Sequence, residues 1–91
     1  MTYLKCKWIH SSPEYPILLY SELDENRWET RKVEIFRDQR IGFAGDGIES
    51  ADTQLGAMPV PPLEEIARDP QFEPVEITKA EFERVWAKAL D

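Results

Sequence analysis

The stretch that most constrains the fold is residues 27–44, RWETRKVEIFRDQRIGFA, which reads as one long β-hairpin. β-Branched and aromatic residues dominate it, and charged residues stand between them, as is typical of strands in a sheet. We expect strands at 27–37 and 40–44, joined by a two-residue turn at Asp38-Gln39. The rest of the chain has to pack around this hairpin.

A two-residue turn would set the register of the hairpin, with Phe36 facing Ile41 and Val33 facing Ala44. Side chains alternate between the two faces of a strand, so each face then receives apolar residues. One face would carry Phe36, Ile41 and Phe43, and the other Val33, Ile35 and Ala44. A hairpin with apolar side chains on both faces is expected at the centre of a small sheet.

The apolar positions of the first strand change phase along the hairpin. Trp28 lies at an even-numbered position, whereas Val33 and Ile35 lie at odd-numbered positions. A β-bulge near Arg31-Lys32 would add one residue and return these side chains to a single face. Without a bulge, Trp28 would lie on the face away from Val33 and Ile35. The sequence is compatible with both arrangements, and we favour the one with the bulge.

Further extended segments are expected on either side of the hairpin. Residues 3–10 alternate between apolar and polar side chains, which predicts a half-buried strand. Residues 17–23 predict a second strand, after a loop whose two prolines stop any helix. Residues 71–77 are expected to run extended near the end of the chain.

Residues 45–62 are rich in glycine and proline and predict a long irregular connection. Such long loops are uncommon in small domains and often carry function. Within this connection, residues 53–58 are a candidate for a short edge strand. The spacing of Asp46, Glu49 and Asp52 does not match a calcium loop, which needs alternating oxygen ligands and a final Glu. We therefore expect no metal site.

Two helices are expected in the last third of the chain. The first is short, at 63–69, with acidic residues in its first turn. The second follows Thr78, an N-cap with Glu81 three residues later, which is the spacing of a capping box. Apolar residues at helical spacing make up its expected buried face: Phe82, Val85, Trp86, Ala89 and Leu90.

These elements predict an α+β fold. A chain of 91 residues closes one core, so we expect a single domain over 1–91. Its expected architecture is a four-stranded, mainly antiparallel sheet, with the C-terminal α-helix packed on one face and a short additional helix beside it.

Charge and composition restrict the function. The net charge is −7, and residues 49–91 carry ten acidic against four basic residues. Phosphate contacts need clustered cations, so general nucleic-acid binding is not expected, whereas a basic protein partner is compatible. Cys6 is the single cysteine, which excludes an intrachain disulfide. No apolar run approaches the length of a membrane span, and we expect a cytoplasmic location.

The chain resembles a family of small bacterial proteins with a domain of unknown function, in the order of its fragments: KWIH, LLYSELDENRWETRKVEIF, RIGFA and FEPVEITKAEFERVW. The family reads K-W-x-H, then LY-SEL-D-x-x-R-W-E-x-R-K-V-E-I-F. Its hairpin turn is usually Asp-Gly, where this chain has Asp38-Gln39. Gln resists the positive φ of a type I′ turn, so we expect a strained turn or another turn type. The resemblance covers almost the whole chain; it implies a complete domain and no particular reaction.

The candidate binding residues come from the sheet face that one terminal helix would leave open. Exposed patches of mixed aromatic and charged residues often mark binding sites. Seven residues make up this candidate site: Tyr20, Glu22, Trp28, Arg31, Glu34, Arg40 and His10. For each ring, core packing is the alternative interpretation, and for the charges it is cross-strand pairing in solvent.

Three functions are compatible with these residues. The leading hypothesis is a small acidic binding module that neutralises or escorts another bacterial protein, in an immunity- or antitoxin-like role. The second is binding or sequestering of a small anionic ligand such as a nucleotide, held by Trp28, Arg31 and Arg40. The third is a small hydrolase using His10 as general base. No catalytic motif or cofactor site is identified, and either a monomer or a homodimer is compatible.

Overall fold

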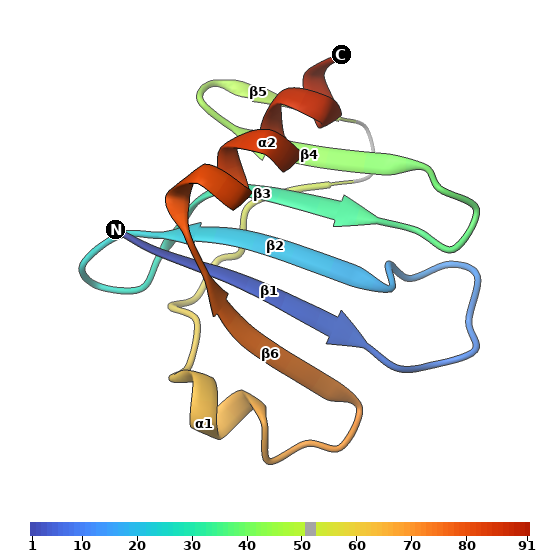
Figure 1. Ribbon diagram of the computed structural model, residues 1–91, viewed down its shortest axis with the longest axis vertical. Coiled ribbons are helices and arrows are strands. Elements are labelled where there is room, and N and C mark those ends of the chain that lie inside the picture. Colours follow the sequence, from blue (N-terminus) through green and yellow to red (C-terminus); the bar gives the residue numbers. More distant parts are fainter. Residues whose placement is uncertain (51–52) are drawn as a thin grey trace.

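The computed structural model describes residues 1–50 and 53–91, so Asp52 of the calcium-loop spacing lies outside the described residues. Within them the chain forms six strands and two helices (Figure 1). The strands are β1 (Thr2–Trp8), β2 (Leu18–Leu23), β3 (Glu29–Ile35), β4 (Ile41–Gly45), β5 (Ile48–Glu49) and β6 (Phe72–Ile77), and the helices are α1 (Leu63–Ile66) and α2 (Lys79–Leu90). The strands form one antiparallel sheet in the order β5-β4-β3-β2-β1-β6. The α+β class with a C-terminal helix is confirmed, and neither helix is long and apolar enough to cross a membrane.

The predicted count of four strands is wrong, because two further strands extend the sheet at its edges. β6 pairs with β1, placing Ile77 opposite Tyr3, although the two strands lie far apart in the sequence. β5 pairs with β4 across a two-residue turn at Asp46-Gly47, whose φ angles are 53° and 79°. Positive φ at both positions is the type I′ geometry that Asp-Gly favours. Residues 53–58, the candidate edge strand, form no strand.

The hairpin of β3 and β4 differs from the predicted register by one residue. Its loop has three residues, because the Gln39 N–H donates to Phe36 O and the Phe36 N–H donates to Arg40 O. Gln39 takes a left-handed conformation with φ 72°, as the third residue of such a loop requires. The large apolar residues of both strands therefore share one face, because Val33 lies opposite Phe43 and Ile35 opposite Ile41, whereas Ala44 lies opposite Lys32 on the other face.

The β-bulge lies at Thr30, one residue before the predicted position. Glu22 pairs with Arg31 and Leu23 pairs with Glu29, which leaves Thr30 as the additional residue of β3. Its hydroxyl donates to Glu22 Oε1 at 2.7 Å. The bulge therefore brings both Thr30 and Arg31 to the side of the sheet where Glu22 lies.

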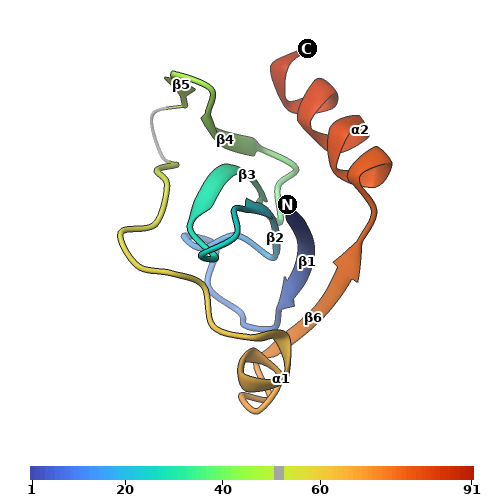
Figure 2. The same ribbon diagram turned by 90° about the vertical axis from the view of Figure 1, so that its left-hand side faces the viewer.

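Helix α2 covers one face of the sheet, which we call the covered face (Figure 2). Thr78 caps the helix as predicted, since its Oγ1 accepts from the Glu81 N–H at 3.1 Å. Phe82 and Trp86 are buried against the sheet, whereas Leu90, predicted to be buried, is exposed. The core lies between helix and sheet and consists of Tyr3, Tyr20, Val33, Phe82 and Trp86, with partly buried apolar residues around them.

The opposite side, which we call the second face, is only partly covered. Residues 53–71, which lead into β6 and include α1, run along it; below we call them the connection (Figure 2). Arg27 holds this connection, because its guanidinium donates to the carbonyls of Val60 and Pro61 at 2.8 and 2.7 Å. The Val60 N–H donates back to Arg27 O. The part of the second face beyond the connection remains open.

Candidate functional site

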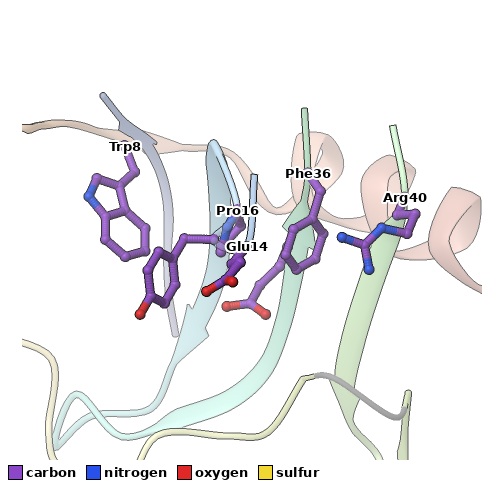
Figure 3. A pocket seen from close by; sticks show the side chains of 7 residues that line it. Trp8, Glu14, Pro16, Phe36 and Arg40 are labelled. Carbon is purple, nitrogen blue, oxygen red and sulfur yellow. The ribbon is translucent and has the colours of Figure 1, made fainter. Parts of the chain in front are cut away.

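The open part of the second face carries a hollow of about 560 Å³. It is lined by Trp8, Glu14, Tyr15, Pro16, Glu34, Phe36 and Arg40, and we call it the aromatic hollow (Figure 3). β1 and β3 run in the same direction because each is antiparallel to β2, so their carboxyl ends lie at the same end of the sheet. Trp8 ends β1 and Phe36 follows β3, which is why residues so distant in sequence line one site.

Trp8 and Tyr15 are two neighbouring rings of the aromatic hollow, and Phe72 supports Trp8 without lining the hollow itself. Trp8 packs against Tyr15 with ring centroids 5.4 Å apart, and against Phe72 of β6 at 5.5 Å. The Trp8 ring is therefore fixed from two sides, while Tyr15 remains 52% exposed. An exposed ring seated on a fixed one loses little conformational freedom on binding, which suits a contact with a partner molecule.

His10 holds the loop that carries Tyr15. The Ser12 backbone N–H donates to His10 Nδ1 at 3.0 Å, so the ring proton lies on Nε2, which donates to Pro16 O at 2.8 Å. The ring also packs edge-on against Trp8, with centroids 4.8 Å apart. Both ring nitrogens are thus engaged by the backbone, an arrangement in which His10 positions the loop.

The charged groups of the hollow differ in how they are paired. Glu34 accepts from the Thr53 hydroxyl at 2.9 Å, and Lys32 Nζ lies 3.8 Å from its other oxygen. Arg40 pairs with Asp38 at 2.9 Å, and its guanidinium lies 4.6 Å from the Phe36 ring centre. The hydrogen bond from the Arg40 backbone N–H lowers the pKa of Asp38, and the hydrogen bond from the Arg40 side chain adds a smaller decrease.

Glu14 is exposed at the rim of the hollow. Its backbone N–H donates to Ser12 Oγ at 3.2 Å, which fixes the position of the residue in the loop. Among the described residues no hydrogen bond or ion pair engages its carboxylate. This carboxylate is therefore available to a ligand.

Three of the predicted binding residues lie on the covered face. Tyr20, Glu22 and Arg31 are all buried beneath α2. Arg31 donates two hydrogen bonds to Glu22, at 2.9 and 2.6 Å, and reaches Glu83 of α2 at 2.8 Å. These hydrogen bonds lower the pKa of Glu22 to about 2 and raise that of Arg31. The guanidinium also lies over two rings of α2, Phe82 and Trp86, 5.0 and 5.2 Å from their centres.

Trp28 is 42% exposed, but it lies just before β3, at the end away from the hollow. β3 has seven residues, roughly 20 Å of extended chain, and it separates Trp28 from Arg40. The structure therefore brings Glu34, Arg40 and the supporting His10 together at one end, and does not bring Trp28, Arg31 and Arg40 together as a nucleotide site would require.

The candidate binding residues chosen from the sequence did not include Trp8, Glu14 or Tyr15. The loop that carries Glu14 and Tyr15 has no alternation or helical spacing, so no pattern marks which of its side chains face the sheet. The two prolines that flank these residues are the one available signal, since they hold the loop in an extended path. The predicted register placed Phe36 on the same face as Ile41 and Phe43, whereas in the structure these two residues share the face of Ile35 and Val33.

A second, smaller hollow of about 170 Å³ lies between the second face and the covering connection. It is largely apolar and is lined by Leu4, Cys6, Leu19, Ser21, Glu29, Val60, Ile66, Phe72 and Pro74. Burial raises the pKa of the Cys6 thiol, which disfavours the reactive thiolate. Over residues 1–50 and 53–91, no group of three His, Cys, Asp or Glu side chains could hold a metal ion.

The fold and the aromatic hollow together define a small α+β domain with one helix-covered sheet face and an open, aromatic-walled concavity on the other. The chain belongs to the family described as domain of unknown function DUF6881, whose model matches residues 2–91. No curated protein and no solved structure matches the chain significantly.

Proposed function

We propose that this domain is a cytoplasmic binding module that neutralises or escorts another protein, in an immunity- or antitoxin-like role. The observation that carries the proposal is the aromatic hollow, because it joins a half-exposed Tyr15 to a fixed Trp8 on the part of the second face that the described residues leave open. Tyrosine, tryptophan and arginine are the residues that contribute most to binding free energy at protein interfaces.

The charge of the chain supports a basic partner. The net charge is −7, and a negative potential of this size accelerates the encounter with a positively charged protein. The rate of association should therefore fall as salt is added, since the Debye length shortens from about 30 Å at 0.01 M to about 8 Å at 0.15 M.

The nucleotide and hydrolase alternatives have less support. Arg31, which an anionic ligand would need, is buried and paired with Glu22 and Glu83. Both ring nitrogens of His10 hold the backbone of its own loop, so a general base would have to break that loop first. Neither alternative is supported by a further feature of the hollow.

Affinity capture with matched variants tests the proposal. We would immobilise the chain, capture proteins from its native host, and compare Tyr15→Ala with Trp28→Ala, which removes a similarly exposed ring at the other end of β3. We expect one specific protein to be retained by the native chain and by Trp28→Ala, and lost with Tyr15→Ala.

The captured protein would then be purified and its affinity measured by calorimetry at several salt concentrations. Equal affinity for the native chain and Tyr15→Ala would show that the hollow is not the binding site. Failure to retain any specific protein would contradict the module itself.

A further inference from the structure

We propose that the aromatic hollow receives a cationic side chain, an arginine or a lysine, projecting from the surface of the partner. This inference rests on the proposed function and specifies the chemistry that the hollow recognises. It is argued from the carboxylates, the rings and the charge balance of the hollow.

Two carboxylates line the same hollow, Glu14 from the loop after β1 and Glu34 from β3. Glu34 is partly buried and held by Thr53, so its position is fixed before any ligand arrives. Glu14 is exposed at the rim and, within the part of the chain that the structure describes, has no partner for its carboxylate. A cation entering the hollow would meet one prepositioned and one adaptable acceptor.

The rings suit a cation as well. A cation over an aromatic face is attracted by the negative charge of the π system, and the attraction strengthens as water is excluded. The hollow already contains one such contact, because the Arg40 guanidinium lies 4.6 Å from the Phe36 ring centre. Trp8 and Tyr15 supply two further rings of the lining. In Figure 3, Trp8 lies on the opposite side of Glu14 from Phe36.

The charge balance favours a cation over an anion. Among the described residues that line the hollow, Arg40 is the cation, and it is paired with Asp38. Lys32 lies closer to Glu29 than to Glu34, at 3.5 against 3.8 Å, and Arg37 donates to His10 O at the same end of the sheet. An anion at Arg40 would face the carboxylates of Glu14 and Glu34, whereas a guanidinium or ammonium would be attracted by both.

The test uses the capped peptide Ac-Gly-Arg-Gly-NH2 as a probe, titrated into the ¹⁵N-labelled chain and followed by NMR. We expect saturable shifts at the Trp8 indole and at the amides around Tyr15 and Phe36, with a dissociation constant on the order of millimolar for one side chain. The peptide with neutral citrulline in place of arginine should bind roughly tenfold more weakly. Inorganic phosphate should produce no saturable shift at these signals.

Two variants locate the site. Glu14→Gln should weaken the arginine peptide roughly two- to fivefold, since an exposed ion pair contributes modestly. Glu34→Gln keeps an oxygen for the Thr53 hydroxyl and should weaken it further. The matched control is Glu25→Gln, an exposed carboxylate in the turn between β2 and β3, which should leave the affinity unchanged.

The results separate this inference from the proposed function. Equal binding of the arginine and citrulline peptides, no saturable shift, or saturable binding of phosphate alone would each overturn the cation site. If the captured partner is still lost with Tyr15→Ala but binds the Glu14→Gln/Glu34→Gln variant as well as the native chain, the module stands and the cation inference is wrong.

Discussion

The two faces of the sheet use charged and aromatic residues in opposite ways. On the covered face, Arg31 is buried among Glu22, Glu83 and two rings, and its hydrogen bonds to both carboxylates are short. On the second face, Tyr15 is half exposed and the carboxylate of Glu14 meets solvent. Satisfied groups hold a fold together, whereas exposed rings beside incompletely paired charges are suited to bind. Loss of stability should therefore follow changes beneath α2 on the covered face, and loss of binding should follow changes in the aromatic hollow on the second face.

The largest effect is expected for Phe82→Ala. The ring is fully buried, so its removal leaves a cavity and should lower the free energy of unfolding by about 3 to 5 kcal/mol. Tyr15→Ala, on the second face, should change it by less than about 0.5 kcal/mol. Urea unfolding followed by circular dichroism measures both. Similar losses for the two variants would remove the distinction between the faces.

Glu22→Gln should lower the free energy of unfolding by about 3 kcal/mol, because it leaves the buried Arg31 guanidinium incompletely paired. The pKa of Glu22 is lowered to about 2 from an ordinary value of 4.5, chiefly by the Arg31 hydrogen bonds. Its stabilisation is therefore present above the ordinary value and is lost as the pH falls toward 2. The free energy of unfolding, measured between pH 5 and about pH 2, should therefore decrease less steeply with falling pH in the variant than in the native chain.

The matched control for that experiment is Glu83→Gln. Glu83 also pairs with Arg31, which lowers its pKa, but its side chain is 42% exposed. Water can replace the lost contact, so the variant should lose less stability than Glu22→Gln. An unchanged acid profile in Glu22→Gln would show that the pair on the covered face does not determine acid stability.

The sequence predicted the covered face better in its elements than in its register. The spacing of Phe82 and Trp86 identified α2 and its buried side, because helical periodicity is a local property. The pairing of Ile35 with Ile41 was missed, since a three-residue loop needs a left-handed Gln39, which the residue type disfavours. Because successive side chains point to opposite faces, this register error of one residue placed Ile41 and Phe43 on the wrong face relative to Val33 and Ile35.

The candidate site could be predicted only in part, for a related reason. Glu34 and Arg40 were identified and do line the hollow. Tyr20 and Arg31 were expected on the open face, but strand alternation cannot say which face a distant helix will cover. β6 was recognised as extended, but its pairing with β1 depends on a tertiary contact across the whole chain. The Asp46-Gly47 turn, in contrast, was a readable local signal that was overlooked.

Arg27→Ala tests how the covered part of the second face is maintained. The substitution removes two hydrogen bonds to the Val60 and Pro61 carbonyls and should lower the free energy of unfolding by about 1 to 2 kcal/mol. The connection should loosen before the sheet does, so hydrogen exchange should accelerate at Val60 and remain slow at Val33. Arg68→Ala, an exposed arginine after α1, is the control and should alter neither.

The smallest effect is expected at the turn beside the hollow. Gln39 has φ 72°, where a side chain other than glycine is strained, so Gln39→Gly should raise the free energy of unfolding by about 0.5 to 1 kcal/mol. The reciprocal control is Gly47→Ala in the type I′ turn, where φ is 79° and a Cβ would meet no atom within 4 Å. Gly47→Ala should lower the free energy of unfolding by about 1 kcal/mol, because alanine is strained at this positive φ although its Cβ has space.

Thermal unfolding of both turn variants measures these changes, and partner binding is measured on the same samples. Gln39→Gly alters the loop between Phe36 and Arg40, two residues that line the hollow. If it raises stability and weakens binding, the strained turn keeps the hollow in its binding geometry at the expense of stability. If it raises stability and leaves binding unchanged, Phe36 and Arg40 are positioned by the sheet alone. A loss of stability would mean that the Gln39 side chain makes a contact worth more than the strain.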